Sequence, residues 1–287
     1  MRYLDATATR SALSMAHAID AMRAAFVRDR EIPQRQQLGA SMFMPGRVGN
    51  TSGIKVVSTV PGSPSGIVVV FAHDGTPLGF VDGPTLTAIR TGAVAGLATD
   101  LLADPSASTL AMLGAGAMAP DQIAAVRAVR PIDTVLIWSR DFSTAASLAH
   151  EVGATPVSDA NEAVAVADVI TTATPAHAPL FDHAALGERV HINAVGAFTP
   201  QMAEIPTQTV IESYVVVDDY DAASHEAGDL LQAGRLPDVD LTELLELGAP
   251  DHGGRTLFKS VGIASQDIAA ARVALENAER LNLGVEL

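Results

Sequence analysis

Apolar residues near the N-terminus recur every three or four positions. They are Met15, Ile19, Met22 and Phe26. This spacing places them on one face of an α-helix. Ser14, directly before them, is a residue type that caps helix N-termini, so the pattern predicts a helix from Ser14 to about Arg30.

Strand-like runs rich in β-branched residues follow at 53–60, 66–72 and 78–81. Segments composed of Gly, Pro, Ser, Asp and Thr separate them at 61–65 and 74–77. Short turns join antiparallel neighbours, so this region predicts a mainly antiparallel sheet. A helix is predicted next, from Thr85 to about Leu102. Its apolar residues on one face are Leu86, Ile89, Ala93 and Leu97.

The pattern changes after residue 105, where short apolar strands alternate with helical segments. Strands are predicted at 109–113, 134–138, 168–172, 191–193 and 214–217. Helices are predicted up to residue 130 and over 141–151, and a last helix over 265–282. This alternation indicates an α/β fold with a doubly wound parallel sheet. The expected division is 105–264 for a Rossmann dinucleotide-binding domain, with 1–104 and 265–287 forming a mainly antiparallel α+β domain.

The composition narrows the classes of function. A net charge of -15 argues against nucleic acid and anionic membranes as partners, because phosphate binding needs a basic surface. The 287 residues contain no Cys, which excludes disulfides, zinc-thiolate sites and a cysteine nucleophile. The eight His residues show no metal-ligand spacing, so no metal is expected. No run spans a bilayer and the N-terminus lacks a signal-peptide plan, so a cytoplasmic protein is expected.

A glycine-rich turn follows the predicted strand 109–113 and opens a helix. Gly114, Gly116 and Ala119 have the G-x-G-x-x-A spacing, and Ala117 and Met118 complete the turn. The first Gly permits a tight turn, the second lets backbone N–H groups approach a pyrophosphate, and the helix N-terminus favours its negative charge. The flanking strand and helix support a dinucleotide site at this turn.

The end of the second strand of this domain indicates which dinucleotide binds. NAD enzymes usually carry Asp or Glu there, for the ribose 2′-hydroxyl. This chain has Ser139 and Arg140, which suit a 2′-phosphate, so NADPH is expected over NADH. Asp141 is expected to cap the next helix. The alternative is that Arg140 is only a surface charge.

Four segments in order carry a resemblance to a known family: LTAIRTGAVAGLATDLL, GAGAMA, HINAVGA and TLFKSVGIASQD. From near residue 3 to near residue 280 the chain resembles the ornithine cyclodeaminase/mu-crystallin family. The family includes ornithine and lysine cyclodeaminases, ketimine and pyrroline-carboxylate reductases, alanine dehydrogenases and mu-crystallin. The resemblance implies a homodimer built through the N-terminal sheet domain. It also implies that the substrate lies between that domain and the nicotinamide.

The resemblance further implies that Arg35, Lys55 and Arg90 are substrate-binding and catalytic residues that hold a substrate carboxylate. Guanidinium groups bind a carboxylate by a bidentate fork, which agrees with an imino or amino acid as substrate. Lys55 also suits protonation of an imine nitrogen, although water is an alternative donor. Without the resemblance, each of the three would more often be an ordinary surface or salt-bridged residue than a functional one.

Cofactor contacts implied by the resemblance are Thr91, Thr172 and Val195. Four further matching positions are expected to have structural or unassigned roles. They are Asp218, Glu226, Asp229 and Lys259. His191 heads an apolar strand, which is more typical of a core residue than of a catalytic one.

Two positions depart from the family pattern. Cyclodeaminases carry an Asp shortly after INAVG, where this chain has Phe198, whose ring accepts no proton. The run 66–70 is wholly apolar and lacks a Thr that contacts substrate. Both changes favour NADPH-dependent reduction of a small cyclic imino acid, such as pyrroline-2-carboxylate or piperideine-2-carboxylate. Two alternatives stay open: a cyclodeaminase or amino-acid dehydrogenase, and a non-catalytic crystallin-like NADPH-binding protein.

Overall fold

The computed structural model describes residues 1–60, 62, 65–250 and 253–287. Backbone contacts divide the chain into two compact units. Unit 1 is Met1–Val94 with Ile263–Leu287, and unit 2 is Ala95–Gly262. The division after Val94 falls inside one continuous helix, α3 (Gly83–Leu102). It lies ten residues before the predicted boundary at 104. Of the predicted turn at 61–65, only residues 62 and 65 lie within the described part of the chain.

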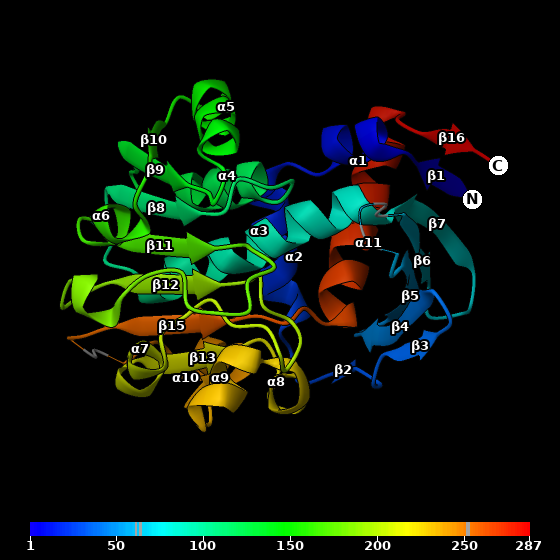
Figure 1. The fold of residues 1–287 in the computed structure, drawn as a ribbon. Helices are drawn as coiled ribbons and strands as arrows, with labels where there is room; N and C mark the ends of the chain where they lie inside the picture. Colours follow the sequence, from blue (N-terminus) through cyan, green and yellow to red (C-terminus); the bar gives the residue numbers. More distant parts are fainter. Residues whose placement is uncertain (61, 63–64, 251–252) are drawn as a thin grey trace. The chain divides into compact units, whose positions relative to one another are not determined.

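Unit 1 is built on a mixed sheet with the strand order β16-β1-β7-β6-β5-β4-β2, and β3 pairs with β4 (Figure 1). Its strands are β1 (Arg2–Leu4), β2 (Arg30–Glu31), β3 (Gln36–Leu38), β4 (Ser41–Val48), β5 (Thr51–Ser58), β6 (Gly66–Phe71), β7 (Pro77–Asp82) and β16 (Val285–Glu286). The run from β5 to β7 is antiparallel, as predicted. β4, which the pattern does not predict, pairs antiparallel with β5, and β1 pairs with β7 in parallel.

The helices of unit 1 are α1 (Ala6–Ala12), α2 (Met15–Ala25), the first part of α3, and α11 (Ala264–Leu281). Ser14 caps α2 as predicted, accepting a hydrogen bond from the backbone N–H of His17 at 3.3 Å. The helix ends at Ala25, before the predicted end near Arg30. α11 packs across β4 to β7. The sheet face beneath this helix therefore holds buried residues, among them Met44 and Val68.

Unit 2 is a parallel sheet with the strand order β10-β9-β8-β11-β12-β15-β13-β14. The strands are β8 (Thr109–Leu113), β9 (Thr134–Trp138), β10 (Thr155–Val157), β11 (Val169–Thr172), β12 (His191–Ala194), β13 (Tyr214–Val217), β14 (Val239–Asp240) and β15 (Thr256–Lys259). The order reverses between β8 and β11. This is the switch point at which doubly wound sheets bind ligands.

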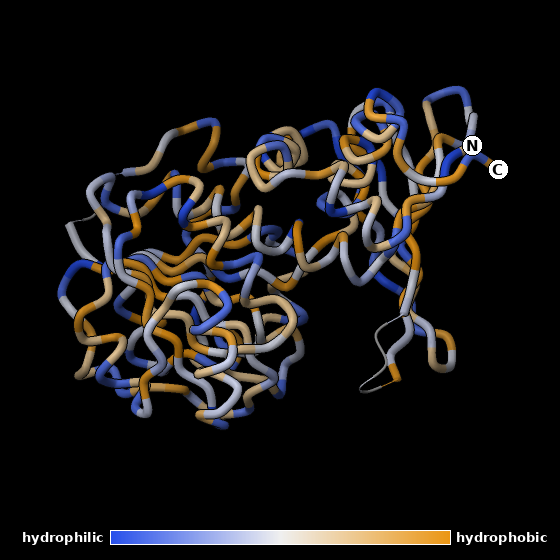
Figure 2. Tube along the Cα trace, turned by 90° about the horizontal axis from the view of Figure 1, so that it is seen from above, coloured by the Kyte–Doolittle hydropathy of each residue, from blue (hydrophilic) through white to orange (hydrophobic). Residues whose placement is uncertain are grey.

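Helices connect these strands in the right order for a doubly wound fold. They are α4 (Ala119–Val129), α5 (Phe142–Val152), α6 (Ala160–Val164), α7 (Thr207–Glu212), α8 (Tyr220–Glu226), α9 (Gly228–Ala233) and α10 (Leu241–Leu247), with a short 3₁₀ turn at His183–Ala185. Alternate residues of β8 belong to two different apolar clusters. Leu110 and Met112 join one cluster, whereas Ala111 and Leu113 join the other. Figure 2, coloured by hydropathy, shows several apolar stretches of chain lying inside this unit.

β15 and α3 are among the elements that differ from the predicted pattern. β15 lies in the middle of the sheet, between β12 and β13, and the sequence pattern does not predict it. α3 is buried around its circumference over 89–99, not only on the face of Leu86 and Leu97. Most residues of this part of the helix are small or apolar on every side, so it has no continuous polar face for solvent.

Candidate functional site

The turn after β8 has the geometry that a dinucleotide requires. Gly114 has φ +115°, and a Cβ there would lie 2.7 Å from the carbonyl oxygen of Ala173. Gly is therefore needed for both backbone conformation and space. At Gly116, no heavy atom outside the turn itself lies within 4 Å of the position that a Cβ would take, so the space above this residue is open. Gly116 and Ala117 are exposed.

The helix that follows this turn is open at its N-terminus. α4 begins at Ala119, and no side chain caps it at Met118. N–H groups in the first turn of a helix attract anions, so the end of α4 suits a pyrophosphate. At the end of β11, the hydroxyl of Thr172 is fully buried and has no hydrogen-bond partner among the described residues. An orphaned hydroxyl at the switch point and an open glycine turn both fit a bound dinucleotide.

Ser139 and Arg140 follow β9 directly. The backbone N–H of Gly114 donates to the carbonyl of Trp138 at 2.8 Å, which keeps the end of β9 beside the glycine turn. Arg140 is exposed and Ser139 is partly exposed. Asp141 caps α5 as predicted, accepting from the backbone N–H of Ser143 at 2.9 Å. The hydrogen bonds from the Ser143 hydroxyl and backbone N–H lower the pKa of the Asp141 carboxyl.

A buried cluster of charges lies in unit 1, on β5, α3 and α11. Lys55 Nζ is 3.2 Å from Asp267 Oδ1, and Arg90 Nε is 3.0 Å from the same oxygen. Arg90 Nη1 also donates to Gln266 Oε1 at 2.6 Å. Lys55 and Arg90 are each 5% exposed, and Asp267 is fully buried. Two predicted site residues therefore meet at one carboxylate.

The pKa of Lys55 is lowered to about 8, chiefly because burial removes the charged amine from water. Asp267 opposes this shift, and the positive charges of Arg90 and Arg35 add to it. For Asp267 itself burial would raise the pKa, but Arg90 and Lys55 outweigh it and the pKa falls below its usual value. Asp267 is therefore a carboxylate at neutral pH, whereas Lys55 exchanges its proton near neutrality.

Arg35 lies between β2 and β3 and is partly exposed. Its positive charge is the smallest of the effects named on the pKa of Lys55. Thr91 follows Arg90 on α3. Its hydroxyl is buried, and no described residue bonds to it.

Sequence reasoning assigned no role to Asp267 or Gln266. Both lie in the segment TLFKSVGIASQD, whose letters carry the family resemblance. A usable signal was present, since an acid and an amide stand in the first turn of an otherwise apolar and Ala-rich helix start. Their partners are distant in sequence, and no local pattern links Asp267 with Lys55.

The turn after β12 holds the remaining predicted positions. Val195 is 7% exposed, whereas Phe198 is 50% exposed. His191, at the start of β12, is a core residue as expected. Its ring nitrogens bond to Thr256 Oγ1 at 2.9 Å and to Asn193 Oδ1 at 3.1 Å. Burial lowers the pKa of His191 to about 4, so the ring is neutral at pH 7.

The polar residues near the ends of β13 and β15 are held inside unit 2. Asp218 Oδ2 accepts from Ser260 Oγ at 2.7 Å and from the backbone N–H of Gly262 at 2.7 Å. Lys259 Nζ and Asp229 Oδ2 form an ion pair of 2.8 Å, with both side chains fully buried. Within the described residues, no three His, Asp or Glu side chains gather in a way that could hold a metal ion. None of the described helices has the length and apolar character to cross a bilayer.

A parallel sheet with an open glycine turn at its switch point defines a dinucleotide-binding protein of the Rossmann class. The chain belongs to the ornithine cyclodeaminase/mu-crystallin family, whose model matches residues 4–282.

The chain is similar to proteins with named activities. It is 37% identical over 224 residues to Delta(1)-pyrroline-2-carboxylate reductase of Bacillus cereus, covering 72% of this chain and 69% of that protein. It is 35% identical over 203 residues to ketimine reductase mu-crystallin of Mus musculus, covering 70% and 65%. The structure of Thermococcus litoralis Delta(1)-pyrroline-2-carboxylate reductase in complex with NADH and L-proline matches with TM-score 0.92 and 27% identity, covering 100% of both chains.

Proposed function

We propose that this protein reduces the C=N bond of a small cyclic imino acid with a nicotinamide dinucleotide. The proposed substrates are pyrroline-2-carboxylate and piperideine-2-carboxylate. The observation that carries the proposal is Lys55, a buried lysine with a pKa of about 8, placed beside Arg90 and under the charge of Arg35. Such a lysine serves as a proton donor at neutral pH, while the arginines attract a carboxylate.

Each of the charged residues of unit 1 has a separate role in the proposed reaction. Arg35 and Arg90 hold the substrate carboxylate, with Lys55 beside them. Lys55 donates its proton to the imine nitrogen. Solvent then reprotonates the neutral side-chain amine of Lys55. Asp267 keeps Lys55 and Arg90 in place through its shared oxygen. A bound nicotinamide would supply the hydride for the imine carbon. Together with the proton from Lys55, this would convert the C=N bond into a CH–NH bond.

In unit 2, the proposed cofactor contacts are those expected from the sequence. They are Thr172, Val195 and the residues of the glycine turn, Gly114, Gly116, Ala117 and Met118; Thr91 of unit 1 is added by the family resemblance. The relative bound to NADH and L-proline supports this pairing of a nicotinamide cofactor with a small cyclic amino acid.

We propose NADPH as the preferred cofactor. Ser139 and Arg140 stand at the end of β9, and Asp141 is engaged in capping α5. An exposed guanidinium at this position suits a 2′-phosphate, whereas a ribose with two hydroxyls offers it no charge to bind.

Two features support a cyclic imine over a diamine. Phe198 stands where cyclodeaminases are expected to carry an Asp, and it offers no acceptor for an ammonium group. β6 is apolar, with Val68 and Val70 fully buried, and Val68 pairs with Lys55 across the sheet. A flat, weakly polar ring suits these neighbours better than a charged chain.

One observation favours a second candidate, an amino-acid dehydrogenase. Asp267 Oδ2 is buried and has no hydrogen-bond partner among the described residues. A carboxylate oxygen beside Lys55 can accept a hydrogen bond from a substrate ammonium group. Oxidation of a linear amino acid with NADP⁺ would then be the main activity.

The deciding experiment mixes purified protein with NADPH and follows absorbance at 340 nm. Pyrroline-2-carboxylate and piperideine-2-carboxylate should be reduced. Pyrroline-5-carboxylate is the matched control, because its C=N bond is remote from the carbon that bears the carboxylate, and it should react at least tenfold more slowly. Faster oxidation of linear amino acids with NADP⁺ would establish the second candidate. Ammonia release from ornithine or lysine with catalytic NAD⁺ would refute both.

The family resemblance also supports a homodimer formed through the sheet of unit 1. Light scattering coupled to size-exclusion chromatography tests this proposal, and a monomer at micromolar concentration would refute it. The proposed reaction itself depends on the charge cluster of one chain.

A further inference from the structure

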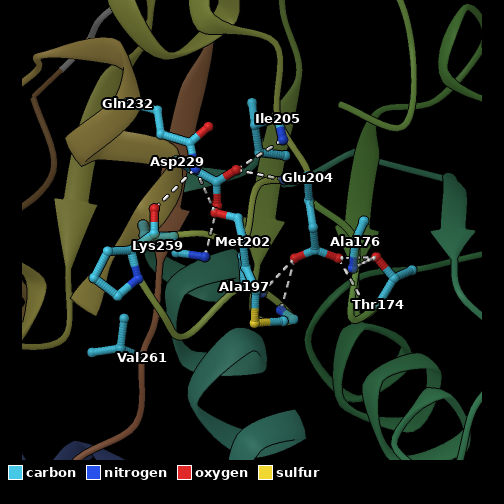
Figure 3. Close-up of polar contacts among 12 residues, drawn as sticks. Thr174, Ala176, Ala197, Met202, Glu204, Ile205, Asp229, Gln232, Lys259 and Val261 are labelled. Atoms are coloured by element: carbon cyan, nitrogen blue, oxygen red, sulfur yellow. Dashed lines mark hydrogen bonds and ion pairs between the residues drawn. The ribbon is translucent and has the colours of Figure 1, made fainter. Parts of the chain in front are cut away.

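A buried glutamate joins two turns at the carboxyl edge of the parallel sheet in unit 2 (Figure 3). Glu204 Oε1 accepts hydrogen bonds from the backbone N–H and the hydroxyl of Thr174, at 2.7 Å and 2.8 Å. Its other oxygen accepts from the backbone N–H groups of Gly196 and Ala197, at 2.8 Å and 3.0 Å. Thr174 follows β11 and Gly196 follows β12. One carboxylate therefore sets the spacing of the two turns.

The contact between the turns leaves no spare room. A Cβ at Gly196 would overlap the backbone of Thr174 and come within 2.5 Å of Glu204 Oε1. β11 and β12 are parallel neighbours, with Thr172 opposite Ala194. The turns are therefore held by the strands on one side and by Glu204 on the other.

Glu204 is itself fixed by a second pair of buried charges. Its backbone N–H and that of Ile205 donate to Asp229 Oδ1, at 2.6 Å and 2.9 Å. Asp229 Oδ2 pairs with Lys259 Nζ at 2.8 Å (Figure 3). Glu204, Asp229 and Lys259 are at most 2% exposed. The pKa of Glu204 is raised, chiefly by burial and also by Asp229, although Lys259 and the Thr174 donors oppose the rise. Both carboxylate oxygens accept from backbone N–H groups, which is the pattern expected of an ionised carboxylate.

Burying a charged carboxylate costs free energy unless its oxygens are hydrogen-bonded or paired. The turns that Glu204 holds are short. The same turns flank the positions proposed to receive the nicotinamide, since Thr172 precedes the first turn and Val195 begins the second. Phe198 comes directly after Gly196 and Ala197, the two residues whose backbone N–H groups donate to Glu204. The network therefore acts on the part of the site where ring orientation matters most.

We propose that Glu204 is a positioning residue for the nicotinamide ring, acting through the backbone of Thr174, Gly196 and Ala197. The inference rests on the proposed use of a nicotinamide dinucleotide. Glu204 touches neither substrate nor cofactor. It keeps the two turns at the separation that the ring requires, while Asp229 and Lys259 hold Glu204 in place.

The test replaces Glu204 with Gln, which keeps the size but turns one acceptor oxygen into a donor. One of the two turns then faces an NH₂ group. In hydrogen exchange of the free protein, peptides covering 172–176 or 194–198 should exchange faster. The kcat of imine reduction should fall at least tenfold. The affinity for 2′,5′-ADP, which lacks the nicotinamide, should stay within threefold, and the fluorescence of bound NADPH should change.

Thr174→Val provides a milder variant. It removes the hydroxyl that donates to Glu204 and accepts from the backbone N–H of Ala176 at 3.3 Å, but it leaves the backbone donor of Thr174 in place. It should change exchange and kcat in the same direction by a smaller factor. Glu188→Gln, an exposed glutamate in the same unit, is the matched control and should change neither. Faster exchange without any change in kcat or NADPH fluorescence would overturn the proposal and leave Glu204 a purely structural residue. Unchanged exchange would overturn it too.

The wild-type protein separates this inference from the proposed function. If it binds NADPH and reduces cyclic imines while Glu204→Gln behaves identically, only the role of Glu204 is refuted. If the wild type does not bind NADPH, both fail together.

Discussion

Lys55 and Arg90 converge on a single oxygen of Asp267, at 3.2 Å and 3.0 Å. The cations implied by the family resemblance to bind the substrate thus already share a carboxylate of the protein itself. Three cations and one anion leave a net positive charge when Lys55 is protonated, which still attracts an anionic substrate. Asp267 also lies in the first turn of α11, where the helix dipole stabilises a negative charge.

Replacing Asp267 by Asn should move the titration of Lys55. The charge of Asp267 and its hydrogen bond both raise the pKa of Lys55, so their loss should bring it below about 8. The basic limb of the pH profile of kcat/KM should shift to lower pH, and kcat/KM at pH 8.5 should fall more than tenfold. Glu276→Gln, on the exposed side of the same helix, is the control. An unmoved basic limb in a folded Asp267→Asn protein would contradict the assignment.

The wild-type pH profile gives a direct test of Lys55 as the proton donor. Its protonated form is the active one, so kcat/KM should be constant below the pKa of about 8 and fall about tenfold per pH unit above it. Lys55→Arg keeps a positive charge that does not titrate in this range. The variant should lose at least a hundredfold in kcat and lose this basic limb as well. Any titration of the substrate itself remains in both proteins and serves as an internal reference. Full activity in Lys55→Arg would show that Lys55 is only an anchor.

Local cues account for the parts of the structure that the sequence predicts best. β8, the glycine turn and α4 follow one another within some twenty residues. This short segment contains the residue patterns typical of a strand, a turn and a helix. β15 is different. It has four residues and ends in Lys259, and its place between β12 and β13 depends on pairing with strands far away in the chain.

The contrast between local patterns and distant contacts also explains which site residues could be predicted from the sequence. Arg35, Lys55 and Arg90 were found through family motifs, and the structure joins Lys55 and Arg90 at one oxygen of Asp267. Asp267 was missed because it lies 212 residues from Lys55 and 177 from Arg90. Contacts over such separations come from the packing of α11 on the sheet, which periodicity does not encode.

Arg90→Lys tests whether Arg90 and Arg35 together bind the substrate carboxylate, as a clamp of two guanidinium groups. The substitution keeps the positive charge but loses the planar fork, and a single ammonium group cannot serve Asp267, Gln266 and a substrate carboxylate together. We expect kcat/KM for the imino acid to fall at least tenfold, equivalent to about 1.4 kcal/mol of transition-state stabilisation. Arg127→Lys, on an exposed face of α4, is the control. A smaller loss would remove Arg90 from the clamp and leave Arg35 as its main donor.

Arg140→Asp tests the choice of cofactor. A carboxylate after β9 would repel a 2′-phosphate and accept a hydrogen bond from a ribose 2′-hydroxyl. Arg140 is exposed, so the substitution should cost little stability. The ratio of kcat/KM for NADPH to that for NADH should fall at least a hundredfold, with most of the change in KM. Arg140→Ser removes the charge without adding repulsion and should give an intermediate ratio. Equal ratios in the wild type and both variants would show that Arg140 does not contact the 2′-phosphate, and the preference would then have to be sought at Ser139.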